Sequence, residues 1–444
     1  MRVLVLFDHS FRFTSKLFYE LAKRKDLEAS LIYIPRPSYD KACKEFYKSV
    51  NQDVLNYYKA SLAHFRSELR SLGYDLQVIR TDSPRSLLKY LLTKYKYDEV
   101  WLDKSYYAAE TASFTALFDS LSVEFLERAF TDFKLRILNS DLLLYGRNIA
   151  TYKQVSSAAS HLLDAKQYPP EELAEMRAYV EFFLNNKLSF NYLPVEVPTD
   201  PHDFNVSEVP YNEEELKLSE AFTNDLRISQ PSYIIHNSLV NYAPNRNKAT
   251  GGTGISGILQ HGAADPNYIV YSLILHYLEC SPENINYLDL YAYIRQLLFR
   301  NKNIRLAQNA PNMCLLPKNL ELICRSYLSA PAYTNLFLPQ ERPLPSEYEK
   351  LAEVFEEYLK TYHTLPNRAR MFHASVVLTR QGCRPIDGIK YLLDLYNNYA
   401  YDGQSPNTYY SIIGSAEFSY GRILRYNPAS TLAHLDSELF SLAL

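Results

Sequence analysis

Residues 2–34 read "RVLVLFDHSFRFTSKLFYELAKRKDLEASLIYI" and contain the pattern that decides the fold. The apolar runs at 2–7 and 28–34 have the length of buried β-strands. Between them, the apolar residues of 15–25 recur at helical spacing, which predicts a helix. A strand, a helix and a second strand in so short a stretch are typical of a parallel α/β sheet.

The same alternation continues along the next seventy residues. It predicts a helix at 53–73 that ends at Gly73, a strand at 75–80, a helix at 86–95 and a strand at 98–103. We therefore expect a Rossmann-like α/β domain at residues 1–130, with a parallel sheet covered by helices on both faces. No G-x-G-x-x-G follows the first strand, so the dinucleotide-binding fingerprint of such domains is absent.

The remainder of the chain divides into two parts with different patterns. Residues 131–230 are rich in proline and acidic residues and lack regular periodicity, which predicts a connector that runs over the surface. Residues 231–444 show helical periodicity and predict an all-α domain. The clearest helical stretches are 266–279, 287–301, 346–362, 368–380 and 385–400.

The composition is that of a large globular protein. The 444 residues are 47% hydrophobic and carry a formal net charge of -3, so no overall charge attracts the chain to nucleic acid or to an anionic membrane. The apolar run at 3–7 is too short for a signal peptide, and no apolar run reaches the roughly 20 residues of a membrane span. We expect a soluble cytoplasmic protein, without a membrane partner, that is a monomer.

The cysteines and aromatic residues narrow the chemistry further. The five cysteines are far apart and lack metal-ligand spacing, so we predict no metal site and expect buried thiols in a reducing compartment. The chain has 39 tyrosines and 22 phenylalanines but a single tryptophan, Trp101.

Glycine is concentrated in one stretch, "ATGGTGISGILQHGAADP" at 249–266, which holds five of the twelve glycines. A nucleoside-triphosphate loop is excluded because no lysine follows these glycines at the required position. Two interpretations remain at this point. The stretch is either an ordinary loop before a helix or a phosphate cradle in which Thr253, Ser256 and backbone N–H groups face an anion.

The longer segment 242–266 resembles the flavin-binding segment of the photolyase/cryptochrome family. The matching residues include Tyr242, Arg246, Thr253 and Ser256. The resemblance implies that the hydroxyl groups of Thr253 and Ser256 grip the diphosphate of FAD. Tyr242 is assigned to the same FAD site.

Further matches to this family follow in chain order. Arg295 falls on the family's flavin-phosphate arginine, and Asn367 and Arg370 fall in its "N-R-x-R-M" helix. The resemblance covers essentially the whole chain. It implies an antenna-type α/β domain at 1–130, the connector at 131–230 and a helical FAD-binding domain at 231–444.

The chain departs from the family around the flavin ring. The family's two aspartates fall on Asn398 and Ala400, and the asparagine that faces N5 falls on Gln404. We therefore assign Asn398 and Gln404 to the cofactor site. Arg370 loses its expected acidic partner, and Asn398, Asp402 or the ligand itself are the alternatives that could compensate.

The family's electron-transfer tryptophans are also absent. They fall on Thr364, Pro385 and Thr408. Tyrosines of the same region provide either another electron route or ordinary helix packing, namely Tyr399, Tyr401, Tyr409 and Tyr410.

The resemblance implies blue-light-driven repair of pyrimidine dimers in DNA by electron transfer from reduced FAD, which is the activity of a deoxyribodipyrimidine photolyase-like lyase. The alternative is a cryptochrome-like light sensor, or a homologue without repair activity and with altered or lost FAD binding. No catalytic residue and no antenna chromophore is assigned. Basic residues near the expected cavity are the candidate contacts to damaged DNA, namely Arg300, Lys302, Arg305, Arg422 and Arg425.

Overall fold

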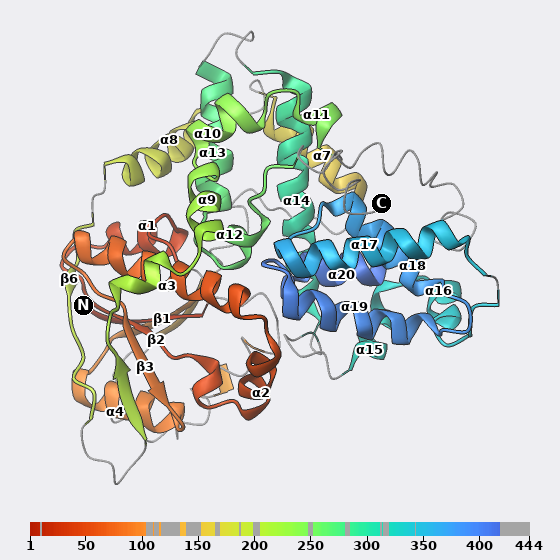
Figure 1. Cartoon of the computed structure of the whole chain (residues 1–444). Helices are drawn as coiled ribbons and strands as arrows, with labels where there is room; N and C mark the ends of the chain where they lie inside the picture. Colours follow the sequence, from red (N-terminus) through yellow and green to blue (C-terminus); the bar gives the residue numbers. More distant parts are fainter. Residues whose placement is uncertain are drawn as a thin grey trace.

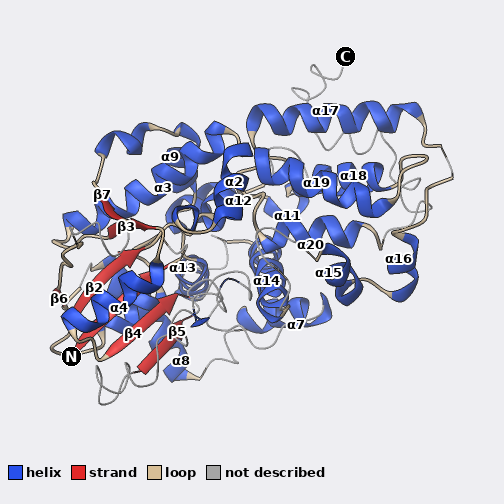
Figure 2. Cartoon of the chain, turned by 90° about the horizontal axis from the view of Figure 1, so that it is seen from below, coloured by secondary structure: helices blue, strands red, loops and turns tan. Residues whose placement is uncertain are grey.

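The computed structural model describes residues 1–8, 11–103, 110, 115–116, 134–138, 152–164, 169–185, 188–198, 205–246, 252–279, 285–310, 313, 319–341 and 343–417. These residues form an α/β unit built on one sheet and a larger set of helices beside it (Figure 1). In the second view, the strands gather at one end of the molecule and the helices of residues 320–415 at the other (Figure 2). The predicted fold class, an α/β domain followed by a helical domain, is confirmed.

All four predicted strands form at the predicted positions. They are β1 (Arg2–Phe7), β2 (Glu28–Tyr33), β3 (Gln77–Thr81) and β4 (Glu99–Asp103). The sheet order is β5-β4-β1-β2-β3-β7, in which β5 spans Lys134–Leu138 and β7 spans Val206–Val209. The strands β1, β2, β3 and β4 are parallel where they pair. Parallel neighbours need crossover helices, and these are α1 (Lys16–Ala22), α3 (Gln52–Ser71) and α4 (Pro84–Tyr95).

Local chemistry explains where these helices begin and end. The Ser15 side chain accepts a hydrogen bond from the backbone N–H of Phe18 and so caps α1. Pro84 occupies the first turn of α4, where its missing N–H is not needed. Gly73, just beyond α3, has φ +85°, a conformation that suits glycine and lets the chain turn into β3.

The sheet is buried on both faces. Val3, Val5 and Phe7 of β1 belong to the core that α1 and α3 cover, whereas Leu4 and Leu6 belong to the core beneath α4. This alternation follows from the two-residue period of a strand. Because side chains on either face of the sheet enter a core, the strands are continuously apolar in sequence.

The range 131–230, predicted as a connector, contributes three strands to the sheet. They are β5 (Lys134–Leu138), β6 (Asn191–Tyr192) and β7 (Val206–Val209), and β7 pairs antiparallel with β3 at the sheet edge. The range also holds α7 (Tyr152–Leu162), α8 (Pro170–Leu184) and α9 (Glu220–Ile228). Described residues of this range thus form strands and helices, and the division of the chain into domains stays a prediction.

The helical unit contains the five helices that the sequence predicted within residues 231–444. They are α13 (Pro266–Glu279), α14 (Tyr287–Asn309), α17 (Ser346–Tyr362), α18 (Asn367–Leu378) and α19 (Pro385–Tyr399). Shorter elements complete the unit, namely α10 (Pro231–Tyr233), α11 (Tyr242–Asn245), α12 (Ser256–Gln260), α15 (Leu320–Tyr327), α16 (Ala330–Asn335) and α20 (Pro406–Ser415). Among the described residues, no helix combines the length and hydropathy that crossing a membrane requires.

The two units share one hydrophobic core. Buried residues of α3, such as Tyr57 and Phe65, belong to the same core as Ile258 of α12, Leu273 of α13 and Ile294 of α14. A separate core joins α17, α18, α19 and α20. The helix α3 thus covers the sheet with one face and packs against the helical unit with another (Figure 1).

Candidate functional site

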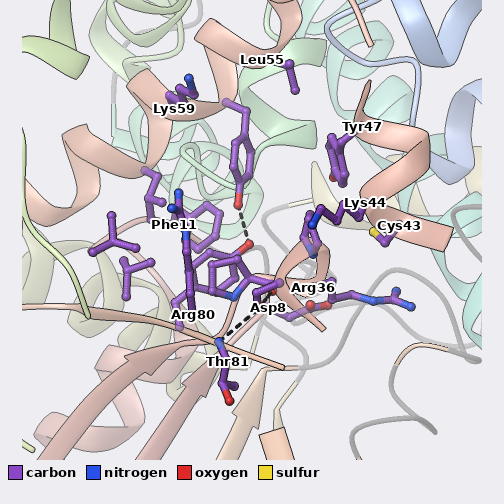
Figure 3. Close-up of a pocket in the computed structure, with 18 of the residues that line it drawn as sticks. Asp8, Phe11, Arg36, Cys43, Lys44, Tyr47, Leu55, Lys59, Arg80 and Thr81 are labelled. Atoms are coloured by element: carbon purple, nitrogen blue, oxygen red, sulfur yellow. Dashed lines mark hydrogen bonds between the residues drawn. The ribbon is translucent and has the colours of Figure 1, made fainter. Parts of the chain in front are cut away.

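A cavity of about 670 Å³ lies where the strands β1, β2 and β3 end, between the sheet and the helices α2 (Lys41–Ser49) and α3. Figure 3 shows residues from these segments pointing into it, including Phe11, Tyr47, Lys59 and Arg80. The carboxyl edge of a parallel sheet is where α/β folds usually bind ligands. The cavity is therefore a candidate binding site.

Aromatic residues form one wall of this cavity. The hydroxyl groups of Tyr33 and Tyr58 lie 2.5 Å apart, and the ring of Phe11 meets that of Tyr33 edge-on with centroids 4.9 Å apart. Burial raises the pKa of both Tyr33 and Tyr58 well above the ordinary value, so both phenols are neutral at physiological pH. Such a wall suits a flat ligand with hydrogen-bonding groups at its edge.

Cations are prominent at the rim of the cavity. Arg36 is paired with Glu110 at 2.7 Å, whereas Lys44, Lys59 and Arg80 are exposed and make no ion pair with a described residue. Four carboxylates also line the cavity, in number equal to its four Lys and Arg residues, namely Asp8, Asp82, Glu110 and Glu215. The aromatic wall suits a planar ligand, and the exposed cations of the rim offer contacts to an anionic group on it.

The helical unit supplies the opposite side of the cavity. His261, at the end of α12, uses its Nε2 to contact the Tyr401 carbonyl oxygen at 2.9 Å, and burial lowers its pKa to about 4. The Tyr47 hydroxyl donates to the Gln404 Oε1 at 3.5 Å. Gln404, which the resemblance assigns to the flavin ring, thus lies at the described cavity between the units.

Arg370 of α18 lies in a second, fully buried polar cluster. Its guanidinium donates to both carboxylate oxygens of Asp402, at 3.0 and 2.8 Å, and to the Thr408 Oγ1 at 2.7 Å. The ring of Tyr396 lies 5.1 Å from the guanidinium carbon. Of the three alternatives open from the sequence, Asp402 is therefore the acidic partner of Arg370.

Asn398 and Asn367 do not join this cluster through any described contact. The Asn398 Oδ1 accepts from the Ser49 hydroxyl at 3.2 Å, and its carbonyl oxygen accepts from the Asn51 N–H at 2.9 Å. Asn398 thus ties the end of α19 to the junction of α2 and α3. Asn367 is the exposed first residue of α18.

The glycine stretch has a packing role that the sequence did not specify. A Cβ added to Gly257 would lie 3.0 Å from the Tyr401 Cβ and 3.1 Å from the Tyr57 hydroxyl, so only glycine lets these elements approach. Thr253 is half-buried and Ser256 is exposed, and neither hydroxyl bonds to a described residue. Both hydroxyls therefore remain available to an anion.

Cations and aromatic rings share one face of α14. Arg295 lies over the ring of Phe299 at 5.3 Å, and the Lys302 Nζ lies 6.0 Å from that ring and 5.9 Å from the ring of Tyr327. Burial lowers the pKa of Arg295, Lys302 and Arg305. Positive charges held partly out of water beside aromatic rings are suited to phosphate groups or to stacked bases.

The other predicted basic residues and Tyr242 occupy different places. The Tyr242 ring packs against that of Tyr293 of α14, with centroids 5.5 Å apart. Arg300 donates to the Leu259 carbonyl oxygen at 2.9 Å and so ties α14 to α12. Arg422 and Arg425 lie outside the described residues.

The structure thus separates the predicted site residues into two groups. Tyr242, Arg295, Lys302 and Arg305 lie on α11 and α14, whereas Arg370, Asn398 and Gln404 lie on α18 or near the ends of α19 and α20. The sequence did not identify the cavity at the sheet edge. Its aromatic wall comes from residues 11, 33 and 58, which share no motif and meet only in the fold.

The fold matches three solved structures over nearly the whole chain. A bacterial class III photolyase from Agrobacterium tumefaciens is 16% identical with a TM-score of 0.59, and the match covers 97% of this chain and 83% of that one. A cryptochrome from Synechocystis sp. PCC6803 is 16% identical with a TM-score of 0.57, over 98% and 88%. An archaeal photolyase from Sulfolobus tokodaii, described with two FAD molecules, is 13% identical with a TM-score of 0.53, over 97% and 86%.

No protein-family model matches the sequence, and no curated protein matches it either. The structural likenesses show that the chain has the fold of photolyases and cryptochromes. The resemblance seen in the sequence is therefore confirmed at the level of the fold.

Proposed function

We propose that the chain is a divergent photolyase/cryptochrome-like flavoprotein that binds FAD in its helical unit. The observation that carries this proposal is the face of α14, where Lys302 is half-buried against aromatic rings and makes no ion pair with a described residue. An anion bound there would compensate the Lys302 ammonium group for the contacts with water that it loses through burial. Arg295, one helical turn from Phe299 on the same face, would bind the FAD phosphates.

The buried cluster at Arg370 supports a site for the flavin ring. The Arg370 Nε is buried and has no hydrogen-bond partner among the described residues, which leaves one donor for a ligand atom. Asp402 and Thr408 fix the orientation of the guanidinium. When bound, FAD would supply the blue-light absorption and one-electron chemistry that no side chain provides.

For the reaction itself, the leading hypothesis is light-driven repair of pyrimidine dimers in DNA. Arg305 would then contact the DNA backbone, together with Arg300, Arg422 and Arg425, whereas Lys302, a DNA candidate from the sequence, is assigned here to FAD. The second hypothesis is a light sensor without repair activity, which is favoured by the loss of the family's tryptophans and of both ring-flanking aspartates. Loss of dimers from irradiated DNA under blue light, with the reduced protein present, distinguishes repair from sensing.

We further propose that the cavity at the sheet edge binds a second planar, anionic chromophore. Its aromatic wall and cationic rim support this assignment. One structural relative is described with two FAD molecules, with the implication of a novel light-harvesting cofactor, which agrees with a second ligand in this fold. FMN and FAD are the first ligands to test.

Neutralising two cations of α14 should weaken FAD binding. In the double variant Arg295→Gln/Lys302→Gln, we expect the Kd for FAD to rise by about 100-fold, since each charged contact contributes on the order of 1.5 kcal/mol. Fluorescence quenching of titrated FAD measures this. Lys350→Gln, at an exposed position of α17, is the matched control and should leave the Kd unchanged. Equal affinity of both variants would rule out the α14 face as the phosphate site.

Removing one cation at the cavity rim should weaken the second site alone. In Arg80→Gln we expect the Kd for FMN to rise about tenfold at low salt, and the difference to shrink as ionic strength rises, because Arg80 is exposed. Isothermal titration at two salt concentrations measures this. Lys25→Gln, an exposed change remote from the cavity lining, serves as the control. A salt-independent Kd that matches the control would contradict an anionic ligand at this rim.

A further inference from the structure

The two units meet at a cluster of polar and aromatic side chains. The Tyr57 hydroxyl of α3 donates to the Asp225 Oδ2 of α9 at 2.7 Å. The Tyr57 ring also stacks on Tyr401, with centroids 4.5 Å apart and planes inclined by 28°. Gly257 of α12 packs closely against both tyrosines, since an added Cβ would lie 3.0 Å from the Tyr401 Cβ and 3.1 Å from the Tyr57 hydroxyl.

Asp225 is the acid of this cluster that lacks a cation. It is partly buried and makes no ion pair with a described residue, whereas the neighbouring Asp402 forms an ion pair with Arg370. Burial and the charge of Asp402 raise the pKa of Asp225 to about 7, although the hydrogen bond from Tyr57 favours the charged form. We therefore expect the protonation of this carboxyl group to change near neutral pH.

Other titratable groups lie on each of the elements that pack around Asp225. Burial lowers the pKa of His261, at the end of α12, to about 4, so its ring is neutral at pH 7. Burial raises the pKa of Tyr401, in the loop after α19, to about 12. On α3, His64 lies 5.8 Å from the Phe222 ring of α9 and contacts Glu68 of its own helix. Two further groups, Glu220 and Arg227 of α9, are exposed.

A second contact between the units also contains a histidine. The His363 Nε2 lies 3.2 Å from the Asp53 Oδ2, and the His363 ring is 5.4 Å from that of Tyr401. His64 and His363 are therefore the two histidines that the test must separate from Asp225.

We propose that Asp225 is a proton-operated latch that closes α9 and α12 onto α3 when it is protonated and loosens this contact when it is charged. The latch bears on the cavity, because His261 at the end of α12 and Gln404 in the adjoining loop both line it. Protonation of one carboxyl group thereby sets how firmly the helical side of the cavity is held. This inference does not depend on which ligand the cavity binds.

The direction follows from proton linkage. In the closed form the pKa of Asp225 is raised, and in an opened form it returns towards its ordinary value of 3.8, so the closed form binds the proton more tightly. Closing is therefore favoured below pH 7. As the pH rises towards 7, the equilibrium constant for closing falls by up to tenfold per pH unit. Above pH 7 Asp225 is charged in both forms, so proton binding no longer favours the closed form.

Hydrogen exchange of the whole protein tests this at pH 5, 6, 7 and 8, with labelling times scaled for the intrinsic exchange rate. We expect the protection of segments 52–62, 220–228 and 256–261 to fall by about 10- to 100-fold from pH 5 to pH 7 and then to level off. Asp225→Asn keeps an oxygen that accepts from Tyr57 and cannot titrate, so its protection should be independent of pH. Asp394→Asn, at an exposed position of α19, should behave like the unchanged protein.

Two further variants separate the histidines from the latch. His64→Gln and His363→Gln should each retain the fall in protection between pH 5 and pH 7 if Asp225 is the responsible group. The proposal is overturned if the unchanged protein shows no fall, or if Asp225→Asn shows the same fall as Asp394→Asn. It is also overturned if either histidine variant abolishes the pH dependence.

Discussion

Replacement of Gly403 by alanine should destabilise the protein by at least about 3 kcal/mol, since it overpacks a site with no room to relax. A Cβ at this position would overlap the carbonyl oxygen of Tyr396 and lie 2.5 Å from its carbonyl carbon and 3.0 Å from the backbone nitrogen of Asn397. All three atoms belong to the backbone of α19. The substitution must therefore displace either the end of this helix or the loop that carries Asp402 and Gln404.

Urea denaturation followed by circular dichroism measures this loss. Gly252→Ala is the matched control, because Gly252 is exposed and an added Cβ meets no atom within 4 Å. We expect the control to unfold at nearly the same urea concentration as the unchanged protein. Equal midpoints for both variants would show that the loop at 400–405 is not packed on α19 as described.

The second large effect is expected at the buried ion pair between Arg370 and Asp402. The side chains are only 5% and 7% exposed, so loss of either partner leaves an uncompensated charge in the interior. We expect Arg370→Met and Asp402→Asn each to cost about 3–5 kcal/mol of unfolding free energy. The double variant should cost much less than the sum, because it buries neither charge.

A double-mutant cycle on the unfolding free energies measures the coupling. Arg384 and Asp387 form an exposed ion pair one helical turn apart and serve as the control cycle, in which we expect no measurable coupling. Additive losses at Arg370 and Asp402 would mean that the two groups do not act as a pair. Flavin content of the same variants then shows whether the pair also matters for cofactor binding.

Local periodicity was sufficient to predict most of the fold. The four strands that end by residue 103 are continuously apolar because helices bury both faces of the sheet, and the long helices of the second half carry clear apolar stripes. The strands β5, β6 and β7 were missed. They are two to five residues long, and β7 lies at an edge, where residues such as Ser207 and Glu208 are exposed and give no apolar alternation.

The candidate site was predicted only in part, because side-chain partners depend on the path of the chain. Asp402 was one of three alternatives for the partner of Arg370, and sequence spacing could not choose among them. Asn398 was assigned to the flavin ring by position, but its described contacts are to Ser49 and Asn51 at the other unit. The Tyr57 contact with Asp225 joins residues 168 positions apart, and no local pattern announces it.

The core that α3 shares with the helical unit has a consequence for how the protein folds. The sheet can form its ladders early, yet the outer face of α3 stays exposed until α9, α12, α13 and α14 have been made and packed against it. Completion of the first unit thus requires residues that are synthesised some two hundred positions later. The two units are distinct in architecture, but each is built on the core that they share, so unfolding of either should expose part of that core to water.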